Sequence, residues 1–352
     1  MSVASKPSLD RAIQCLLCQT AGPILYAGLP DRLFGIAGRW NLRRCPRCGL
    51  VWIEPCPPPE ELGRLYAGYY THTIEAPTTG MRLAVKNAIL AAAFGYPELT
   101  DQIRSARGLA AIGLLKEMAG LSVMLLDGRR RGRLLDVGCG NGQFVAAMRT
   151  LGWDARGIDV DEGGLAVARQ HFGVPVTQGT LAEARFPAHS FDAVTLHHVI
   201  EHVPDPVDVL RECGRILQPG GRIVVVTPNI ESLGHRLFRT RWLGLDVPRH
   251  LQLFSTGNLR IAAELAGLVV ESMSTATRQA FLIGLSSLHL VRAGVLPGAR
   301  PPRIGPGQWL IGAAFQALEH TLSRVAPLGE EIVMIATRAG AAQERRAGES
   351  SR

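Results

Sequence analysis

The sequence predicts an α/β fold, in which a doubly wound, mostly parallel sheet follows a small cysteine-rich module. Two observations support this prediction. Short apolar runs alternate with helix-like segments over residues 131–338, as is typical of a parallel sheet covered by helices on both faces. The first of these runs ends in a cluster of glycines, where such sheets place a strand-to-helix turn.

Seven strands are expected in this region. Each is a short run rich in Val, Ile and Leu that is bounded by glycine, proline or polar residues. The expected strands are 133–137, 155–160, 174–178, 191–196, 222–227, 268–274 and 331–337. The expected helices are 142–151, 162–171, 206–217 and 256–266, the last with Ser255 as its N-cap.

Composition changes along the chain suggest where its parts begin and end. Residues 1–58 are rich in Cys, Pro, Gly and Arg and form the module, and residues 59–130 are expected to be a helical linker or cap. The α/β domain then covers residues 131–339, with a long apolar insertion, 280–327, before its last strand. We expect this insertion to be helical and to build a lid, a dimer face or a membrane-facing surface. The polar residues 340–352 are expected to be a disordered tail.

The composition is that of a protein with a large buried core. Hydrophobic residues make up 47% of the 352 residues and charged residues 19%, which excludes global disorder. The net charge of +8 suits an anionic partner but does not choose among small anions, lipid headgroups and nucleic acid. We find no signal peptide, and the most apolar segment, 280–296, is broken by His289 and Arg292. We therefore expect a cytoplasmic protein.

The turn after the first strand carries the most informative motif, Asp136-Val137-Gly138-Cys139-Gly140-Asn141-Gly142. Glycines at a strand-to-helix turn let the backbone approach a ligand closely, and the helix N-terminus offers N–H groups to it. The next strand ends at Asp159, where a carboxylate can accept hydrogen bonds from both hydroxyls of a ribose. Together these features predict a nucleoside-binding site.

Two kinds of nucleoside cofactor fit such a turn, and a tight turn without a ligand is the third interpretation. A dinucleotide site needs the spacing G-x-G-x-x-G, whereas the glycines here run G-x-G-x-G and position 143 is Gln. Asp136 stands before the first glycine, where its carboxylate would repel a pyrophosphate. The same carboxylate suits a ligand that carries an ammonium and a sulfonium group.

This segment resembles the first motif of the class I S-adenosylmethionine-dependent methyltransferases. Three further segments resemble later motifs of the same family: Ser190 to Val194, His197 to Val203, and Leu217 to Gly221. The resemblance covers about residues 131–275 and is specific as a set. The chain is similar to small-molecule methyltransferases of the ubiquinone-pathway O-methyltransferase type. This resemblance implies a Rossmann-like fold and S-adenosyl-L-methionine as the cofactor.

The resemblance also assigns residues to the cofactor. The loop glycines would line its methionine part, Asp159 would hold the ribose, and His197 would pack beside the sulfonium. Thr180 and Leu181 would flank the adenine, although the family usually carries Asp at the position of Thr180, which puts the adenine contact in doubt. The full set is Asp136, Gly138, Gly140, Asn141, Asp159, Val160, Thr180, Leu181 and His197.

Three histidines lie where an acceptor pocket is expected: His198, His202 and His250. Methyl transfer from a sulfonium is an in-line displacement, so the protein mainly has to align acceptor, carbon and sulfur. A hydroxyl acceptor also needs a base, and histidine is the usual choice near neutral pH. We predict His250 and His202 as the catalytic residues. The alternatives are that His202 belongs to a helix-start structure and that His250, with Arg249, ties its loop to the domain.

Three other side chains near this region have two interpretations each. Asn229 either lines the acceptor pocket or caps a turn. Trp242 and Phe254 either form an apolar wall for the acceptor or belong to the core.

Two CxxC pairs, Cys15–Cys18 and Cys45–Cys48, lie in the N-terminal module. Each pair can present two thiolates from one tight turn, and two facing turns make a closed tetrahedral Cys₄ site that fits structural zinc. The separation between the pairs leaves room for a hairpin, so we predict a zinc-ribbon-like module. Unrelated thiols are the alternative. A redox dithiol is disfavoured because no thioredoxin-like βαβ pattern surrounds either pair.

The leading functional hypothesis is a methyltransferase that acts on an oxygen or nitrogen of a small molecule, such as a sugar, lipid or secondary-metabolite precursor. The second is an RNA or protein methyltransferase that docks its substrate on the module, whose basic residues include Arg43 and Arg44. The third is a non-catalytic cofactor-binding scaffold. We do not expect nucleic acid as the partner, because the fourth strand is not followed by an Asn/Asp-Pro-Pro-Tyr/Phe type of sequence. A peripheral membrane or carrier-protein contact is kept as a further partner hypothesis.

Overall fold

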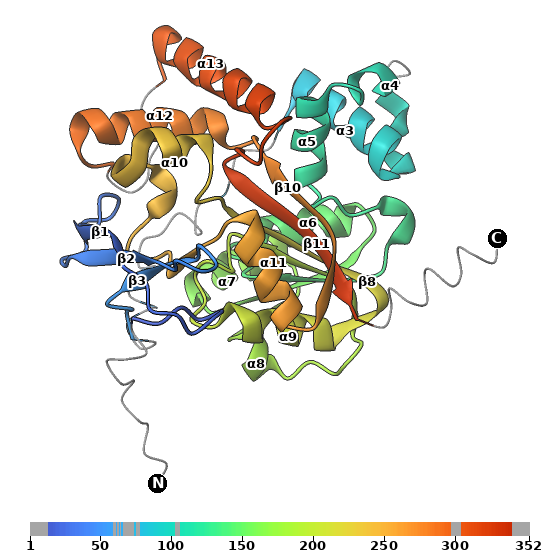
Figure 1. The fold of residues 1–352 in the computed structure, drawn as a ribbon. Coiled ribbons are helices and arrows are strands. Elements are labelled where there is room, and N and C mark those ends of the chain that lie inside the picture. Colours follow the sequence, from blue (N-terminus) through green and yellow to red (C-terminus); the bar gives the residue numbers. More distant parts are fainter. Residues whose placement is uncertain are drawn as a thin grey trace.

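The computed structural model describes residues 13–58, 78–102, 106–296 and 304–339, together with residues 61, 63, 65 and 74. Most of these residues form an α/β domain around a seven-stranded sheet, and a four-stranded sheet lies beside it (Figure 1). The predicted tail, 340–352, lies outside the described residues, as do parts of the predicted linker and of the insertion.

The larger sheet is the predicted doubly wound, mostly parallel sheet. Its strands are β4 (Arg133–Val137), β5 (Asp154–Asp159), β6 (Val176–Gln178), β7 (Phe191–His197), β8 (Leu217–Pro228), β10 (Leu268–Ala276) and β11 (Glu331–Arg338). Their order is β10-β11-β8-β7-β4-β5-β6. The strands from β8 to β6 pair in parallel, whereas β11 pairs antiparallel with both β8 and β10. The predicted fold class is therefore confirmed.

Helices cover both faces of this sheet. The α-helices in the described residues are α3 (Gly80–Phe94), α4 (Ala106–Leu109), α5 (Gly113–Leu121), α6 (Gln143–Thr150), α7 (Glu162–Val167), α8 (Leu181–Ala184), α9 (Pro206–Ile216), α10 (Leu233–Phe238), α11 (Thr256–Leu265), α12 (Ala280–Ala293) and α13 (Pro306–Leu322). Of these, α10, α12 and α13 pack on one another rather than on the sheet. The helices at 206–216 and 256–265 match their predicted positions. The side chain of Ser255 accepts from the Asn258 N–H and so caps α11 as predicted.

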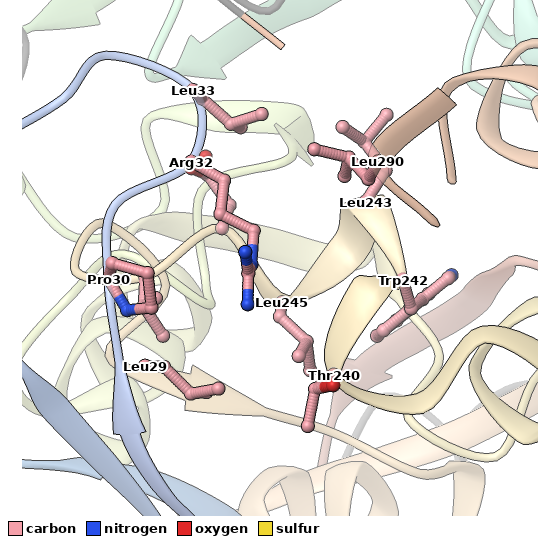
Figure 2. Close-up of a pocket in the computed structure, with 11 residues that line it drawn as sticks. Leu29, Pro30, Arg32, Leu33, Thr240, Trp242, Leu243, Leu245 and Leu290 are labelled. Atoms are coloured by element: carbon pink, nitrogen blue, oxygen red, sulfur yellow. The ribbon is translucent and has the colours of Figure 1, made fainter. Parts of the chain in front are cut away.

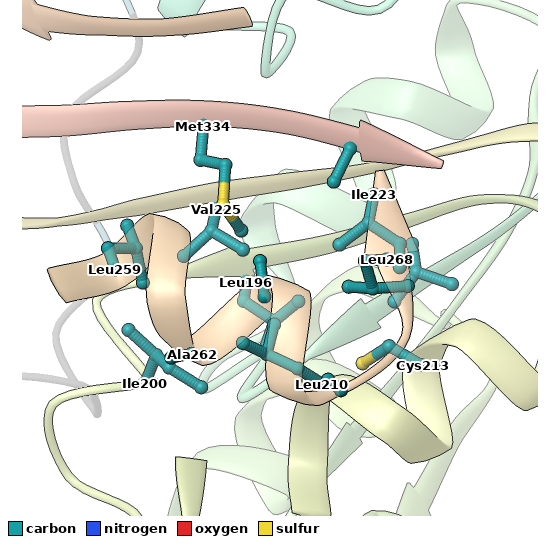
Figure 3. Packing of buried hydrophobic residues seen from close by; sticks show 14 of the residues in the cluster. Leu196, Ile200, Leu210, Cys213, Ile223, Val225, Leu259, Ala262, Leu268 and Met334 are labelled. Carbon is teal, nitrogen blue, oxygen red and sulfur yellow. The ribbon is translucent and has the colours of Figure 1, made fainter. Parts of the chain in front are cut away.

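The buried side chains explain why the strands are apolar on both sides. Along β4, Leu135 belongs to the core under α9 and α11, and its neighbour Leu134 belongs to the core under α3, α5, α6 and α7. Figure 3 shows Leu210 of α9 and Leu259 of α11 packed beside Leu196 of β7. Burying a side chain of this size contributes roughly 1.5–3 kcal/mol. These two cores hold the strand ends, and so the site described below, in place.

The four-stranded sheet joins the N-terminal module to the α/β domain. Its strands are β1 (Ile24–Leu29), β2 (Trp40–Arg44), β3 (Val51–Glu54) and β9 (Gln252–Leu253), paired antiparallel in that order. The hairpin of β1 and β2 lies between the two CxxC pairs, where the sequence left room for one. The fourth strand, β9, comes from the α/β domain, and Cys15, Leu50 and Trp52 share a core with α11. The module and the domain are thus built on common strands and a common core.

The insertion supplies two helices, α12 and α13, that pack against each other, and α12 also packs against α10. A buried carboxylate anchors α13, since Glu319 Oε1 accepts from the Glu330 N–H at 2.9 Å. Trp309 and Leu310, near the start of α13, are exposed. Within the described part of the chain, we find no helix with the length and apolar character needed to cross a membrane.

A small cavity of about 20 Å³ lies where the module, the loop before His250 and α12 meet (Figure 2). Its lining includes Arg32 from the module, Trp242 from the loop and Leu290 from α12. A volume of this size holds about one water molecule. We therefore treat it as a packing feature of this junction rather than as a ligand pocket.

One buried ion pair connects the module to the loop that carries His250. The guanidinium of Arg249 donates to Asp31 from Nη1 and Nη2 at 3.0 and 2.9 Å, and to Asp246 from Nε at 2.8 Å. Arg249 and Asp31 are inaccessible to solvent, and Arg249 also lies over the ring of Phe34. Such bidentate pairs are strong and geometrically specific. Removing the cation would leave two buried carboxylates without a partner charge.

We predict that Arg249→Met lowers the free energy of unfolding by about 3–5 kcal/mol, because it breaks a buried pair from one side. Urea unfolding followed by circular dichroism measures this loss. The control is Arg169→Met, which removes an exposed pair with Glu162 and should cost less than about 1 kcal/mol. Equal losses in the two variants would contradict the structural importance of Arg249.

Candidate active site

Three neighbouring strands bring the predicted cofactor residues to one edge of the sheet. β4 lies between β5 and β7, and Val137 is aligned with both Ile158 and Leu196. Because parallel strands end on the same edge, the turn after Val137 lies beside Asp159 and His197, which are the last residues of β5 and β7. This is the edge at which ligands bind in open α/β sheets.

The glycine loop adopts a backbone conformation in which residues other than glycine would be strained. Gly138, Gly140 and Gly142 have φ values of 70°, 51° and 75°, in the left-handed region. A Cβ atom on Gly138 would also lie 2.4 Å from Cγ2 of Val199. The Gly140 N–H donates to Oδ2 of Asp159 at 2.8 Å, which ties the loop to the end of β5. The predicted loop and its predicted acidic partner are therefore in direct contact.

Cys139 is the small residue inside this loop, and its packing explains a glycine in the neighbouring strand. A Cβ atom on Gly157 would lie 2.4 Å from Sγ of Cys139. The loop can therefore lie this close to β5 only because position 157 has no side chain.

Asp159 and Val160 form the part of the edge that fits a nucleoside. Asp159 is half-buried, and its other oxygen, Oδ1, accepts from the Asp161 N–H at 2.9 Å. Burial raises the pKa of this carboxyl above its usual range. Val160 follows with 59% of its surface exposed, an apolar side chain beside a carboxylate. The carboxylate can accept hydrogen bonds from the hydroxyl groups of a ribose, and the apolar side chain beside it can contact the ring of the base.

Asp136 is the deepest acidic group at this edge. It is buried at the end of β4, and the hydroxyl of Thr195 donates to its Oδ1 at 2.7 Å. Burial raises the pKa of Asp136 to about 7, and the nearby charge of Asp159 acts in the same direction. Two carboxylates that disfavour each other's ionisation attract a cation, since a positive ligand offsets the cost of their burial.

The remaining predicted cofactor residues lie around the same loop. The Gly179 N–H donates to the Asp159 carbonyl, so Thr180 and Leu181 follow β6 beside the nucleoside edge. Thr180 is exposed and forms a capping box with Glu183, while Leu181 is buried. The side-chain oxygen of Asn141 accepts from the Gln143 N–H and so closes the turn. The hydroxyl of Thr180 thus caps a helix and is not directed to a ligand.

His197 lies in a cluster of charged side chains at the end of β7. Nη2 of Arg278 donates to Nε2 of His197 at 2.8 Å, and burial lowers the pKa of His197 to about 3, so its ring is neutral. His198 lies between two buried carboxylates, with Nδ1 3.1 Å from Glu201 and Nε2 2.8 Å from Glu331. Although burial opposes it, these hydrogen bonds raise the pKa of His198 to about 9, and the ring is cationic.

The backbone at His198 supports this interpretation of the cluster. Its φ of 55° lies in the left-handed region, which is costly for a residue with a side chain. The contacts of the cationic ring with two carboxylates offset that strain. Sequence reasoning placed His198 near the pocket but gave it no partner.

The two predicted catalytic histidines are neighbours in space. The ring centroids of His202 and His250 are 4.7 Å apart. Nδ1 of His202 lies 3.0 Å from the carbonyl oxygen of Arg249, and Nδ1 of His250 lies 2.8 Å from that of Gly244. Burial lowers the pKa of His202 to about 4, with His250 acting in the same direction. Glu201 offers a carboxylate oxygen to the same group.

The four cysteines of the two CxxC pairs converge on one point. Sγ of Cys15 is 3.5 Å from that of Cys48, and Sγ of Cys18 is 3.3 Å from that of Cys45 and 3.7 Å from that of Cys48. All four ligand atoms lie within 4.8 Å of one another. The prediction that the pairs face each other is confirmed.

Some functional side chains were missed from the sequence. Arg278 and Glu331 meet His197 and His198 only because β10 and β11 run antiparallel and bring their ends to this edge. No motif in the sequence around Arg278 or Glu331 indicates that either residue lies at this edge. Glu201 could have been found, since it directly precedes the predicted His202.

Asn229, Trp242 and Phe254, which the sequence placed either at the acceptor pocket or in the structural framework, have structural roles. Asn229 donates from Nδ2 to two backbone carbonyls, those of Pro327 and Gly329, and so joins two turns. Trp242 is buried and donates from Nε1 to Glu330 at 2.7 Å, and Phe254 is fully buried. Neither aromatic side chain is exposed to form a wall for an acceptor.

Comparison with known proteins gives a consistent result for the α/β domain. Residues 111–273 match a family model described as a methyltransferase domain. The chain is 45% identical over 105 residues to a ubiquinone biosynthesis O-methyltransferase of Marinobacter nauticus, covering 28% of this chain and 44% of that protein. It is 40% identical over 103 residues to the protein of that name from Pseudomonas aeruginosa, again covering 28% and 44%. The chain thus matches less than half the length of these relatives.

Among solved structures, a SAM-dependent methyltransferase from Archaeoglobus fulgidus overlaps with a TM-score of 0.40 at 18% identity, over 59% of this chain and 86% of that one.

The raised pKa of Asp136 predicts a pH-dependent stability. A carboxyl whose pKa is higher in the folded state than in the unfolded state contributes stability at low pH that is lost as the pH rises. With a rise from 3.8 to about 7, the free energy of unfolding should fall by on the order of 4 kcal/mol between about pH 4 and pH 7. Asp136→Asn should remove this part of the pH dependence, which urea unfolding at several pH values measures. A variant whose pH dependence equals that of the wild type would contradict the assignment.

Proposed function

We propose that this chain, whose α/β domain belongs to the class I S-adenosylmethionine-dependent methyltransferases, transfers a methyl group from S-adenosyl-L-methionine to an oxygen of a small molecule. One observation supports this proposal most directly: two carboxylates, Asp136 and Asp159, flank a left-handed glycine loop at the carboxyl edge of the sheet. This combination suits a cationic nucleoside and disfavours a pyrophosphate.

We propose the following cofactor contacts. The loop of Gly138, Gly140 and Asn141 would approach the methionine part, and Asp136 would lie nearest to its positive charge. Asp159 would accept from the ribose hydroxyls through the lone pairs that its two backbone contacts leave. The other four assigned residues are Val160, Thr180 and Leu181, which would contact the adenine, and His197, which would lie beside the sulfonium. Because the donor is already activated, alignment is the main task of the protein in methyl transfer.

The acceptor is proposed to be a hydroxyl group of a small molecule. The relatives named as O-methyltransferases support oxygen over nitrogen. The hydroxyl proton has to leave during the reaction, and we propose His250 and His202 for this step. A carbonyl oxygen can only accept, so the Nδ1 atom of each ring carries the hydrogen and Nε2 carries the lone pair. In its neutral form, each ring can therefore accept a proton through Nε2.

A macromolecular substrate docked on the module is less well supported. Two of the basic residues that suggested it have acidic partners within the protein. Arg43 pairs with Glu54 at 2.8 Å, and Arg44 lies 3.9 Å from Glu231. A surface whose cations are already paired attracts a phosphate backbone less strongly.

We propose that the four cysteines hold a structural zinc ion. Zinc–sulfur bonds of about 2.3 Å in a tetrahedron place sulfur atoms about 3.8 Å apart. The sulfur separations of 3.3, 3.5 and 3.7 Å come close to this value. A closed Cys₄ site has no open position for a substrate, so the ion would stabilise the module rather than take part in methyl transfer.

We predict that Asp159→Ala and Asp136→Ala each weaken S-adenosylmethionine binding roughly 10- to 100-fold, the range expected when a hydrogen bond to a charged group is lost. Isothermal titration calorimetry measures the affinity. Asp154→Ala is the matched control, because Asp154 lies at the opposite end of the same strand as Asp159. Unchanged affinity in both test variants would exclude the proposed cofactor site.

We predict that Cys45→Ser lowers the zinc content by one ion per chain and lowers the unfolding midpoint, because it removes one of the four thiolates. Elemental analysis of the purified chain measures the metal. Cys56→Ser is the control, since Cys56 is exposed and lies outside the cluster. A zinc content that is the same in both variants would argue against the cysteine site.

A further inference from the structure

We propose that the insertion between β10 and β11 docks this protein on the surface of an anionic lipid bilayer, through an exposed apolar face of α13. The insertion lies outside residues 111–273, which match the methyltransferase family model. The proposal therefore concerns a segment that the family assignment does not cover, and it goes beyond the proposed methyl transfer.

The first support is the set of side chains that α13 leaves exposed. Six exposed residues lie three or four positions apart along the helix and so share one face, which we call the α13 stripe: Leu310, Ile311, Ala314, Ala317, Leu318 and Thr321. Five of the six have hydrocarbon side chains, and none is charged. Leu310 and Leu318 expose 65% and 50% of their surface. The outer face of this helix is therefore apolar along most of its length.

The buried face of α13 is more polar than the exposed one. Gln316 donates from Nε2 to the carbonyl oxygen of Thr277 at 3.2 Å. Glu319 is fully buried, and its Oε1 accepts from the Glu330 N–H. A helix on the surface of a protein in water normally buries its apolar residues and exposes its polar ones. Because α13 has the reverse arrangement, its outer face is suited to an apolar environment.

The apolar surface continues beyond α13. Figure 1 shows α13 at the top edge of the molecule, with α12 below it, and the two helices pack against each other. Leu282 and Val291 of α12 are exposed, as is Val325, which follows α13 closely. Exposed apolar side chains that extend over neighbouring elements are typical of a surface that contacts a membrane or another protein.

The charges of the insertion indicate which occupant fits this surface. Residues 279–327 contain four arginines and one acidic residue, which are Arg292, Arg300, Arg303, Arg324 and Glu319. Glu319 is buried, whereas Arg292 and Arg324 are exposed. An apolar helix face together with arginines is the combination with which amphipathic helices bind anionic bilayers, because apolar burial and attraction to the headgroups act together.

A second copy of this chain is the competing occupant. Pairing of two α13 stripes would bring the arginines of both copies into the same region. The insertion has no exposed acidic residue with which they could pair, so their mutual repulsion would oppose such a dimer. An anionic bilayer instead offers a negative charge to the arginines and hydrocarbon to the stripe.

Co-sedimentation of the full chain with lipid vesicles tests the proposal. We expect binding to vesicles of mixed phosphatidylglycerol and phosphatidylcholine at low salt, and roughly 10-fold weaker binding to vesicles of phosphatidylcholine alone. Leu310→Gln combined with Leu318→Gln should weaken binding to the anionic vesicles roughly 10-fold, because two apolar side chains no longer enter the bilayer interface. Arg324→Gln should weaken it about 5-fold, because one attraction to the headgroups is lost.

Leu265→Gln is the matched control for the leucine substitutions. Leu265 is 50% exposed, like Leu318, but it lies on α11 and outside the insertion. This variant should bind the anionic vesicles as the wild type does. The substituted side chains are all exposed, so each variant should keep the wild-type urea midpoint, which is measured in parallel.

Three results would overturn the proposal. The first is that the full chain does not sediment with the anionic vesicles. The second is an equal loss of binding in the double leucine variant and in Leu265→Gln. The third is a dimer in sedimentation velocity that the double leucine variant dissociates, because a second copy would then be the occupant of the stripe. None of these measurements uses S-adenosylmethionine, so failure of the docking surface is distinguishable from failure of the methyltransferase assignment.

Discussion

The region around His202 and His250 depends on one buried cation, the guanidinium of Arg249. It holds Asp31 of the N-terminal module and Asp246 of the loop after β8 at the same time. The backbone carbonyl oxygen of Arg249 contacts His202, and the next residue in the chain is His250. A guanidinium keeps its charge at all relevant pH values, so the cation at the centre of this arrangement does not titrate. A single side chain therefore fixes the module, the loop and both histidines relative to one another.

Features that are local in the sequence were predictable. Strands buried on both faces appear as continuous apolar runs, so β4 was predicted with the bounds that the structure shows, 133–137. The glycine loop and Asp159 were found because each lies at the end of such a run, and the sheet topology then brings them together. The two CxxC pairs were found for the same reason, since each pair is complete within four residues. In these cases the chemistry of a site is contained in a short segment.

Features that depend on pairing between distant segments were not predictable. Asp31 and Arg249 are separated by 218 positions, and neither has a local pattern that identifies its partner. Arg278 and Glu331 flank the insertion and meet at the active-site edge only through the antiparallel β10 and β11. The buried carboxyl groups of Glu319 and Glu330 belong to the same class, because a charged residue in a helix or strand is usually exposed. Sequence reasoning assigns such residues to the surface, and only the topology corrects it.

The two residues of β9 have a consequence for how relatives of this protein could diversify. β9 completes the sheet of the module, yet it belongs to the loop that carries Arg249 and His250. A chimaera that received only a foreign cysteine module would present an unmatched strand edge to β9 and would lack the counter-ion of Arg249. Inheritance of the module is thus tied to inheritance of roughly the segment between β8 and α11. Natural recombination at the boundary between module and linker would separate parts that fold together.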